Sequence, residues 1–197
     1  MSNKFTYQVL RDTTTDTVIK LTGVFDGTGQ EANNSRIQAS SLSGALDSSK
    51  ANLLSNTSNT GALTYYDLQL TGLKYYVNMP SSNTGTGLGT VEIFWNGSGS
   101  SSSAQYANSA TIFHLNQSGE FGLGEQLPSI LNNSGNTAIG SLANTAGNGD
   151  IGVYTYGATA NCSYTLVISL RKNNNMYQRG QLNDPAAFNY GPYSLKP

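Results

Sequence analysis

The sequence predicts an all-β fold, a single antiparallel sandwich or barrel of about eight strands. Short apolar runs rich in Val, Ile, Thr, Tyr and Phe recur along the chain and have the length of strands. Clusters of Gly, Ser and Asn separate them, and these residues favour turns because they tolerate positive φ or bond their own backbone. Long segments with helical periodicity are absent, so one β domain is the expectation for 197 residues.

The apolar runs give the expected strands in order. One further segment, "IQASSLSGALDSSKANLL" at 37–54, has an incomplete helical stripe, so it is either a helix or a strand followed by a loop. The expected strands are residues 5–10, 17–25, 65–70, 73–79, 90–95, 110–115, 151–157 and 164–172.

The Gly/Ser tract "NGSGSSSSAQYANS" at 96–109 could be a domain linker, a phosphate-binding loop or a surface loop. The apolar runs on both sides are needed to complete one sandwich, which argues against a linker. A phosphate loop would lead into a helix, but this tract leads into the strand-like "TIFHL". We therefore expect a loop that joins two strands.

The surface is polar but carries little charge. Charged residues are 11% of the chain and the net charge is -1, without a basic block, so phosphate-driven nucleic-acid binding is not expected. The sequence has neither a secretory signal nor a membrane-spanning apolar run, which indicates folding in a cytoplasm and no membrane partner. The single Cys162 is expected to be buried and inert in a strand.

One motif has the spacing of a dinucleotide-binding loop. Gly27, Gly29 and Ala32 follow an apolar strand, and Asp47 lies about twenty residues after the first glycine. The following "NNSRIQASS" is a poor helix start, and the chain lacks alternating strands and helices. We interpret the motif as a strand-to-loop turn at Asp26 and Gly27, and expect no cofactor.

Candidate catalytic groups are few and scattered. His114 is the only histidine and has no nucleophile-elbow motif to accompany it. Glu92, Glu120, Glu125 and Asp150 could supply a carboxylate pair for glycoside hydrolysis, but nothing in the sequence selects a pair. Zinc spacing and calcium loops are absent, so we expect neither catalysis nor a bound metal.

Tyrosine is the most informative residue type. The chain has twelve, including the pairs Tyr65-Tyr66 and Tyr75-Tyr76. If each pair lies in a strand, one ring faces the core and the other faces outward. Outward tyrosines suit a protein or sugar interface, whereas ordinary cross-strand packing is the alternative reading.

The C-terminal segment 173–197 differs from the preceding β domain, residues 1–172. It carries three of the five prolines and several aromatic residues, so it is expected to be an extended arm. Such an arm could dock on a neighbouring subunit or pack back onto its own domain. Its candidate interface residues are Met176, Tyr177, Phe188, Tyr190 and Tyr193.

Three stretches carry a resemblance to a known class of protein. They are "KFTYQVLRDTTTDTVIKLTGVFDGTGQEANNSRIQASSLSGAL", "VEIFWNG" and "GDIGVYTYGATANCSYTLVISLRK". Together they resemble small β-rich virion proteins of tailed bacteriophages, particularly jelly-roll decoration or cement proteins. The resemblance implies a jelly roll that binds the major capsid protein on the outer capsid surface as a homotrimer and stabilises the shell. It transfers no catalytic residue.

Two other classes of function compete with this reading. A carbohydrate- or receptor-binding module of a phage tail would also suit a jelly roll, and exposed aromatics near Trp95 and Tyr106 would favour it. A hydrolase would require acids that converge in space or a site centred on His114.

Overall fold

Alternating polar and apolar residues in the sequence become strands with one buried and one outward face in the computed structural model. In β10 (Ser163–Lys172), every second residue from Tyr164 onward is buried, and β2 (Asp16–Val24) follows the same pattern. Their buried side chains form one side of the core. The structure describes residues 2–45, 68–79, 89–95, 110–122, 132–133, 150–172 and 177.

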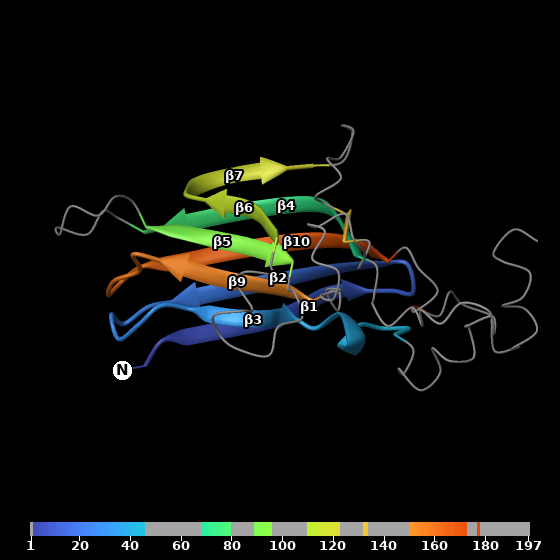
Figure 1. Cartoon of the computed structure of the whole chain (residues 1–197), viewed down its shortest axis with the longest axis horizontal. Helices are drawn as coiled ribbons and strands as arrows, with labels where there is room; N and C mark the ends of the chain where they lie inside the picture. The colour runs from blue at the N-terminus through green and yellow to red at the C-terminus, as the bar shows by residue number, and fades with distance from the viewer. Residues whose placement is uncertain are drawn as a thin grey trace, which may run out of the picture.

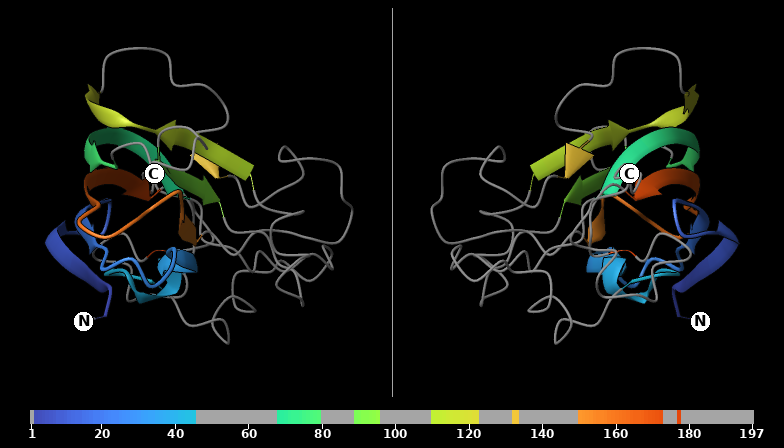
Figure 2. Two further views of the ribbon diagram at one scale, coloured as in Figure 1. Left: turned by 90° about the vertical axis from the view of Figure 1, so that its left-hand side faces the viewer. Right: turned by 90° about the vertical axis from the view of Figure 1, so that its right-hand side faces the viewer.

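The strands form two antiparallel sheets that face each other as layers (Figures 1 and 2). The first sheet has the order β1-β2-β10-β4-β7, with the short β8 paired to β4, and the second has the order β3-β9-β5-β6. The bounds of the remaining strands are β1 Lys4–Asp12, β3 Ala32–Ile37, β4 Leu68–Asn78, β5 Thr90–Trp95, β6 Ala110–Leu115, β7 Gln117–Phe121, β8 Asn132–Asn133 and β9 Ile151–Tyr156.

The strand order is that of a jelly roll. When β1 and β8 are set aside, the first remaining strand pairs with the last (β2 with β10) and the second with the last but one (β3 with β9). The third pairs with the sixth (β4 with β7), and the two in the middle pair with each other (β5 with β6). This nested pairing folds one long antiparallel hairpin into two sheets, so the sandwich predicted from the sequence is confirmed. β1 is an additional strand at the edge of the first sheet.

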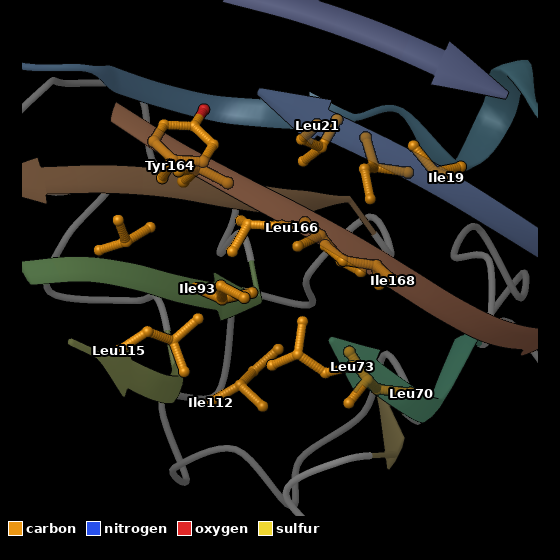
Figure 3. Packing of buried hydrophobic residues seen from close by; sticks show 14 of the residues in the cluster. Ile19, Leu21, Leu70, Leu73, Ile93, Ile112, Leu115, Tyr164, Leu166 and Ile168 are labelled. Atoms are coloured by element: carbon orange, nitrogen blue, oxygen red, sulfur yellow. The ribbon is translucent and has the colours of Figure 1, made fainter. Parts of the chain in front are cut away.

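The core lies between the two sheets (Figure 3). Leu21, Leu166 and Ile168 of the first sheet face Ile93 and other buried residues of the second, and these four side chains are fully buried. Burying an aliphatic side chain of this size stabilises a fold by about 1.5–3 kcal/mol. The packing of these two layers is therefore the main stabilising interaction of the domain.

Most of the expected strands coincide with observed ones. The expected runs 73–79 and the end of 65–70 belong to a single strand, β4, which begins at Leu68 in the described part. β3 and β7 were not expected, because "ANNSRI" and "QSGEF" have few apolar residues. Both lie at sheet edges, where one partner strand and few buried side chains are enough to hold a strand.

The ambiguous segment 37–54 contains a short 3-10 helix, Ala39–Ser41, after the end of β3. Residues 46–54 lie outside the described part of the chain. The Gly/Ser tract also lies outside it, but Trp95 pairs with Ala110 directly across the tract. The tract therefore joins two neighbouring strands of one sheet, as expected, and does not separate two domains.

Candidate interaction surface

Tyr75 and Tyr76 point to opposite faces of β4, as the sequence predicted. Tyr75 is half-buried and packs against the core, whereas Tyr76 is 57% exposed. The Tyr75 ring lies over its cross-strand partner Gly119, where an added Cβ would lie 2.4 Å from the hydroxyl oxygen. A glycine at this position is needed for the close approach of the Tyr75 ring.

Tyr76 lies in a row of hydroxyl groups that crosses the outward face of the first sheet. Thr6 is opposite Thr22, Thr22 is opposite Thr165, Thr165 is opposite Tyr76, and Tyr76 is opposite Ser118. The Thr6 and Thr22 hydroxyls are 2.5 Å apart. We call this row the Tyr76 face; it offers one large ring among small polar groups and carries no charge of its own.

Ionic groups border the Tyr76 face. Lys74 and Glu120 form an ion pair of 2.9 Å on the next row, and both side chains are more than 60% exposed. A pair this exposed contributes about 0–1 kcal/mol to stability. The Lys74–Glu120 pair therefore contributes little to stability and forms a charged rim beside the Tyr76 face.

β1 is the most exposed apolar element of the described residues. All residues of β1 up to Arg11 are exposed. Phe5, Tyr7 and Val9 are 37%, 41% and 45% exposed, and they lie opposite the inward-facing Gly23, Leu21 and Ile19 of β2. They therefore continue the core-facing side of the first sheet to its edge, where only Phe5 is partly covered, by Phe25 and by Arg36 of β3.

Tyr177 corrects part of the expectation for the C-terminal segment. It is 1% exposed, forms a β-bridge with Ala45 and donates a hydrogen bond of 3.0 Å from its hydroxyl to the carbonyl of Ala39. The core of the domain therefore extends past Lys172 to Tyr177, and this ring is not available as an anchor on a neighbour. Its contacts with Ala39 and Ala45 join segments far apart in the chain, so they could not be read from the local sequence.

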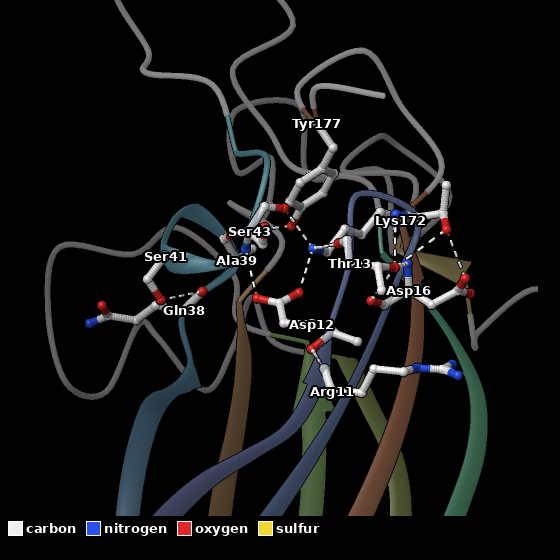
Figure 4. Close-up of polar contacts among 12 residues, drawn as sticks. Arg11, Asp12, Thr13, Asp16, Gln38, Ala39, Ser41, Ser43, Lys172 and Tyr177 are labelled. Atoms are coloured by element: carbon white, nitrogen blue, oxygen red, sulfur yellow. Dashed lines mark hydrogen bonds and ion pairs between the residues drawn. The ribbon is translucent and has the colours of Figure 1, made fainter. Parts of the chain in front are cut away.

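Tyr177 covers a buried lysine at the end of the sandwich (Figure 4). The Lys172 ammonium is fully buried and donates to Asp12 Oδ1 at 2.6 Å, to the Thr13 carbonyl at 2.5 Å and to the Ser43 carbonyl at 2.6 Å. Asp12 Oδ2 also accepts from the Ser43 amide at 2.7 Å. All three ammonium protons are used, so the charge joins the β1–β2 turn, the segment after β3 and the end of β10.

Each described acidic candidate for catalysis forms hydrogen bonds or an ion pair with a different set of residues within the fold. Glu92 accepts hydrogen bonds from the hydroxyls of Thr111 and Tyr156, and His114 Nε2 lies 4.0 Å from it. Asp150 accepts from the Ala39 amide at 2.8 Å, and Glu120 pairs with Lys74 in the other sheet. Glu125 lies outside the described residues.

The structure does not bring these acids together. Glu92 lies opposite Tyr154, and Asp150 is four residues further along the same strand direction. At about 3.3 Å per residue this places their backbones roughly 13 Å apart. His114 is 60% exposed beside Glu92, with the Tyr154 and Tyr156 rings 4.5 Å apart on the same outward face. This cluster is a polar and aromatic feature that sequence spacing did not reveal.

A second buried polar group lies at the opposite margin of the sandwich. Tyr164 donates its hydroxyl proton to Glu31, which is 3% exposed, and Arg36 Nε lies 3.1 Å from Glu31 Oε1. Burial raises the pKa of Glu31, while the Tyr164 hydrogen bond and the Arg36 charge partly oppose this. The pKa of the Tyr164 hydroxyl is raised, mainly because the group is buried and to a lesser extent because the negative charge of Glu31 is close.

The dinucleotide-like motif is a turn, as interpreted from the sequence. Gly27 has φ +93, and Asp26 Oδ1 accepts from the Thr28 amide at 2.9 Å and from its hydroxyl at 2.6 Å. Ala32 begins β3 and not a helix. Cys162 is fully buried, as expected, but it lies in the turn before β10, where its sulfur accepts from the Thr159 amide at 3.2 Å.

Several expected interface residues lie outside the described part of the chain. Among the described residues there is no group of three or more His, Cys, Asp or Glu that could hold a metal ion. In the same residues, no helix has the length and apolar character needed to cross a membrane. The undescribed candidates are Tyr65, Tyr66, Met176, Phe188, Tyr190 and Tyr193.

No family model matches the chain, and no curated protein matches its sequence. Among solved structures, a chain in the single-particle structure of Maize Chlorotic Mottle Virus has 10% sequence identity and a TM-score of 0.21. That alignment covers 92% of this chain and 99% of the viral one, but the TM-score is too low to support an argument.

Proposed function

We propose that the chain is a non-enzymatic virion structural protein of a tailed bacteriophage. In this proposal it decorates the outer capsid surface as a homotrimer, binds the major capsid protein and stabilises the shell after assembly in the host cytoplasm. The observation that carries the proposal is the distribution of apolar surface. Polar and charged groups in the described core are used in contacts within the fold, whereas aromatic and aliphatic side chains are exposed on β1 and the Tyr76 face.

The fold supports the proposal by analogy. Jelly rolls are used for capsid and lectin domains, although a fold alone does not define a function. The low charge suits a protein that packs against other proteins, because charged residues are depleted at the centres of interfaces. Tyr76 is the anchor that we assign to this contact, since a tyrosine buries a large area at low entropic cost.

The test combines oligomeric state with capsid attachment. Sedimentation of the full chain at micromolar concentration should give a mass that is a multiple of three chains, and a stable monomer would contradict the trimer. Purified protein should bind capsids that lack it and occupy their outer surface in a cryo-EM map. Tyr76→Ser should lower this occupancy, whereas Asn78→Ser, exposed on the same strand, should not. Absence of the protein from the capsid surface would refute the proposal.

The row of hydroxyls around Tyr76 favours a second candidate, a carbohydrate- or receptor-binding module of a phage tail. An aromatic ring beside hydroxyl groups can stack on a sugar and bond its hydroxyls. The two functions are separated by a glycan-binding screen with the same pair of variants. Sugar binding that Tyr76→Ser abolishes, together with no binding to capsids, would select the tail module.

A further inference from the structure

The edge of the first sheet formed by β1 carries a second inference. Four of the seven large hydrophobic side chains that are exposed among the described residues lie on this one strand, and a fifth, Val24, lies on the adjacent β2. β1 has nine residues and, among the strands that the structure describes, pairs with β2 on one side only. A free edge of this length presents unpaired backbone groups to another strand.

Natural proteins protect such edges with lysines, prolines, bulges or short strands. β1 has a bulge between Val9 and Arg11, but residues 5–9 contain neither a charge nor a proline. A charge does reach this stretch from β3, since the Arg36 guanidinium lies 5.8 Å over the Phe5 ring and donates to the Thr6 carbonyl at 2.8 Å, but it leaves Tyr7 and Val9 more than 40% exposed. In Figure 2 the strand, in dark blue near the N label, lies at the outer margin of its sheet.

We propose that β1 pairs with β1 of a second copy of this chain, antiparallel and about a two-fold axis at Tyr7. The proposal goes beyond the proposed function, because it assigns a two-fold contact that neither the trimer nor capsid attachment requires. The pairing would join the first sheets of two copies into one continuous sheet.

The residue pattern of β1 selects the second copy and the register. Phe5, Tyr7 and Val9 share the core-facing side and are symmetric about Tyr7. Antiparallel pairing centred there places Phe5 opposite Val9 of the partner and Tyr7 opposite Tyr7, so both apolar rows meet on the same face. A slip by one residue would place apolar side chains opposite outward-facing ones.

Charge favours the same arrangement. The charged residues of β1 are Lys4 at one end and Arg11 and Asp12 at the other. Parallel pairing would put Lys4 beside Lys4 and Arg11 beside Arg11, and like charges directly opposite each other are unfavourable. In the antiparallel register, Lys4 is opposite Leu10 and the central five positions are uncharged.

The mass of the assembly is the first test. Sedimentation of the full chain should give an even multiple of the chain mass, and Tyr7→Lys should halve it, because two ammonium groups would meet on the axis. Asn78→Lys, exposed on β4 of the same sheet, is the control and should change nothing. A mass of six chains would support both this contact and the trimer, and two chains would support this contact alone. Three chains, or one, would overturn it.

Cross-linking tests the register. Tyr7→Cys should form a disulfide between two copies under mild oxidation, because residues on the axis face each other; Asn78→Cys should not. The native Cys162 is fully buried and does not compete. No faster cross-linking than the control would overturn the proposal. The proposal would also be overturned if cross-linking appeared only in a chain that ends at Tyr177, because this result would mean that residues 178–197 cover β1 in the full chain. Loss of capsid binding in Tyr7→Lys at unchanged mass would identify the capsid protein as the occupant and overturn it too.

Discussion

At the scale of single residues, buried polar groups hold the two ends of the sandwich. Lys172 closes one end through three hydrogen bonds, and Glu31 with Tyr164 and Arg36 occupies the opposite margin. A buried charge is tolerated only when its partners are in place, because the interior solvates it poorly. These groups are therefore sensitive positions although they are remote from the exposed surfaces.

Replacing Lys172 tests the first of these groups. Lys172→Met should lower the free energy of unfolding by about 3–5 kcal/mol, because it removes the cation paired with Asp12 and the donor to Asp12 Oδ1 and two carbonyls. The neighbouring Arg171→Met, on an exposed side chain of the same strand, should change it by about 0.5 kcal/mol or less. Urea unfolding of the three proteins makes the comparison, and equal effects of the two substitutions would show that the ammonium is dispensable.

The raised pKa of Glu31 predicts a pH dependence of stability. The folded state holds the proton more tightly than the unfolded chain, whose value is near 4.5. The stabilisation from this proton is full below that value and is lost as the pH rises through the folded pKa. Glu31→Gln removes this titration but not the other acids. The unfolding free energy of the native chain minus that of the variant should therefore fall as the pH rises from about 4.5; a constant or rising difference would contradict the assignment.

At the scale of elements, rings that lie over strand glycines fix how neighbouring strands approach. Tyr164 lies over Gly23, Tyr75 over Gly119 and Phe94 over Gly152, and in each case ring and glycine are direct cross-strand partners. An aromatic ring over a glycine shields backbone that has no side chain of its own. The same device occurs in both sheets.

Gly152→Ala tests this packing in the second sheet. The added Cβ would lie 2.2 Å from the Phe94 ring, so the ring or the strand must move, at a cost of about 1–3 kcal/mol. Gly29→Ala is the matched control, since nothing lies within 4 Å of its added Cβ. Thermal unfolding should show a clear loss for the first variant and little change for the second. A Gly152→Ala protein as stable as the control would mean that Phe94 is free to turn away.

At the scale of the whole molecule, the core of the β domain includes Tyr177, which follows the expected end of the domain at Lys172. The Tyr177 ring is part of the core and lies 5.2 Å from the Lys172 ammonium. The docking of residues 178–197 on a neighbouring subunit stays a prediction. It concerns association, whereas Tyr177 concerns the stability of the domain.

Two truncations separate these roles. A chain ending at Tyr177 should unfold like the full protein but lose three-fold association or capsid attachment. A chain ending at Lys172 should lose about 3–5 kcal/mol more, on the scale of deleting a buried aromatic side chain. Urea unfolding and sedimentation report the two effects. If the chain ending at Tyr177 is unfolded, the arm belongs to the core. If that chain folds and binds capsids with unchanged affinity, the docking prediction is wrong.

The sequence by itself determined the β class, most of the strands and the opposite orientation of the Tyr75 and Tyr76 rings, because period-2 alternation and turn residues act locally; which of the two rings is exposed came from the structure. It also excluded the helix that the motif at Gly27 would need. Edge strands such as β3 and β7 escaped, since they are held by pairing more than by burial of their own side chains. The tertiary structure alone decided the nested strand order, the cage of Lys172 and the burial of Tyr177. The β2–β10 pair that closes the nested order, the Lys172 contacts and the Tyr177 hydrogen bond all join residues more than a hundred positions apart, and no local pattern records which distant groups will meet.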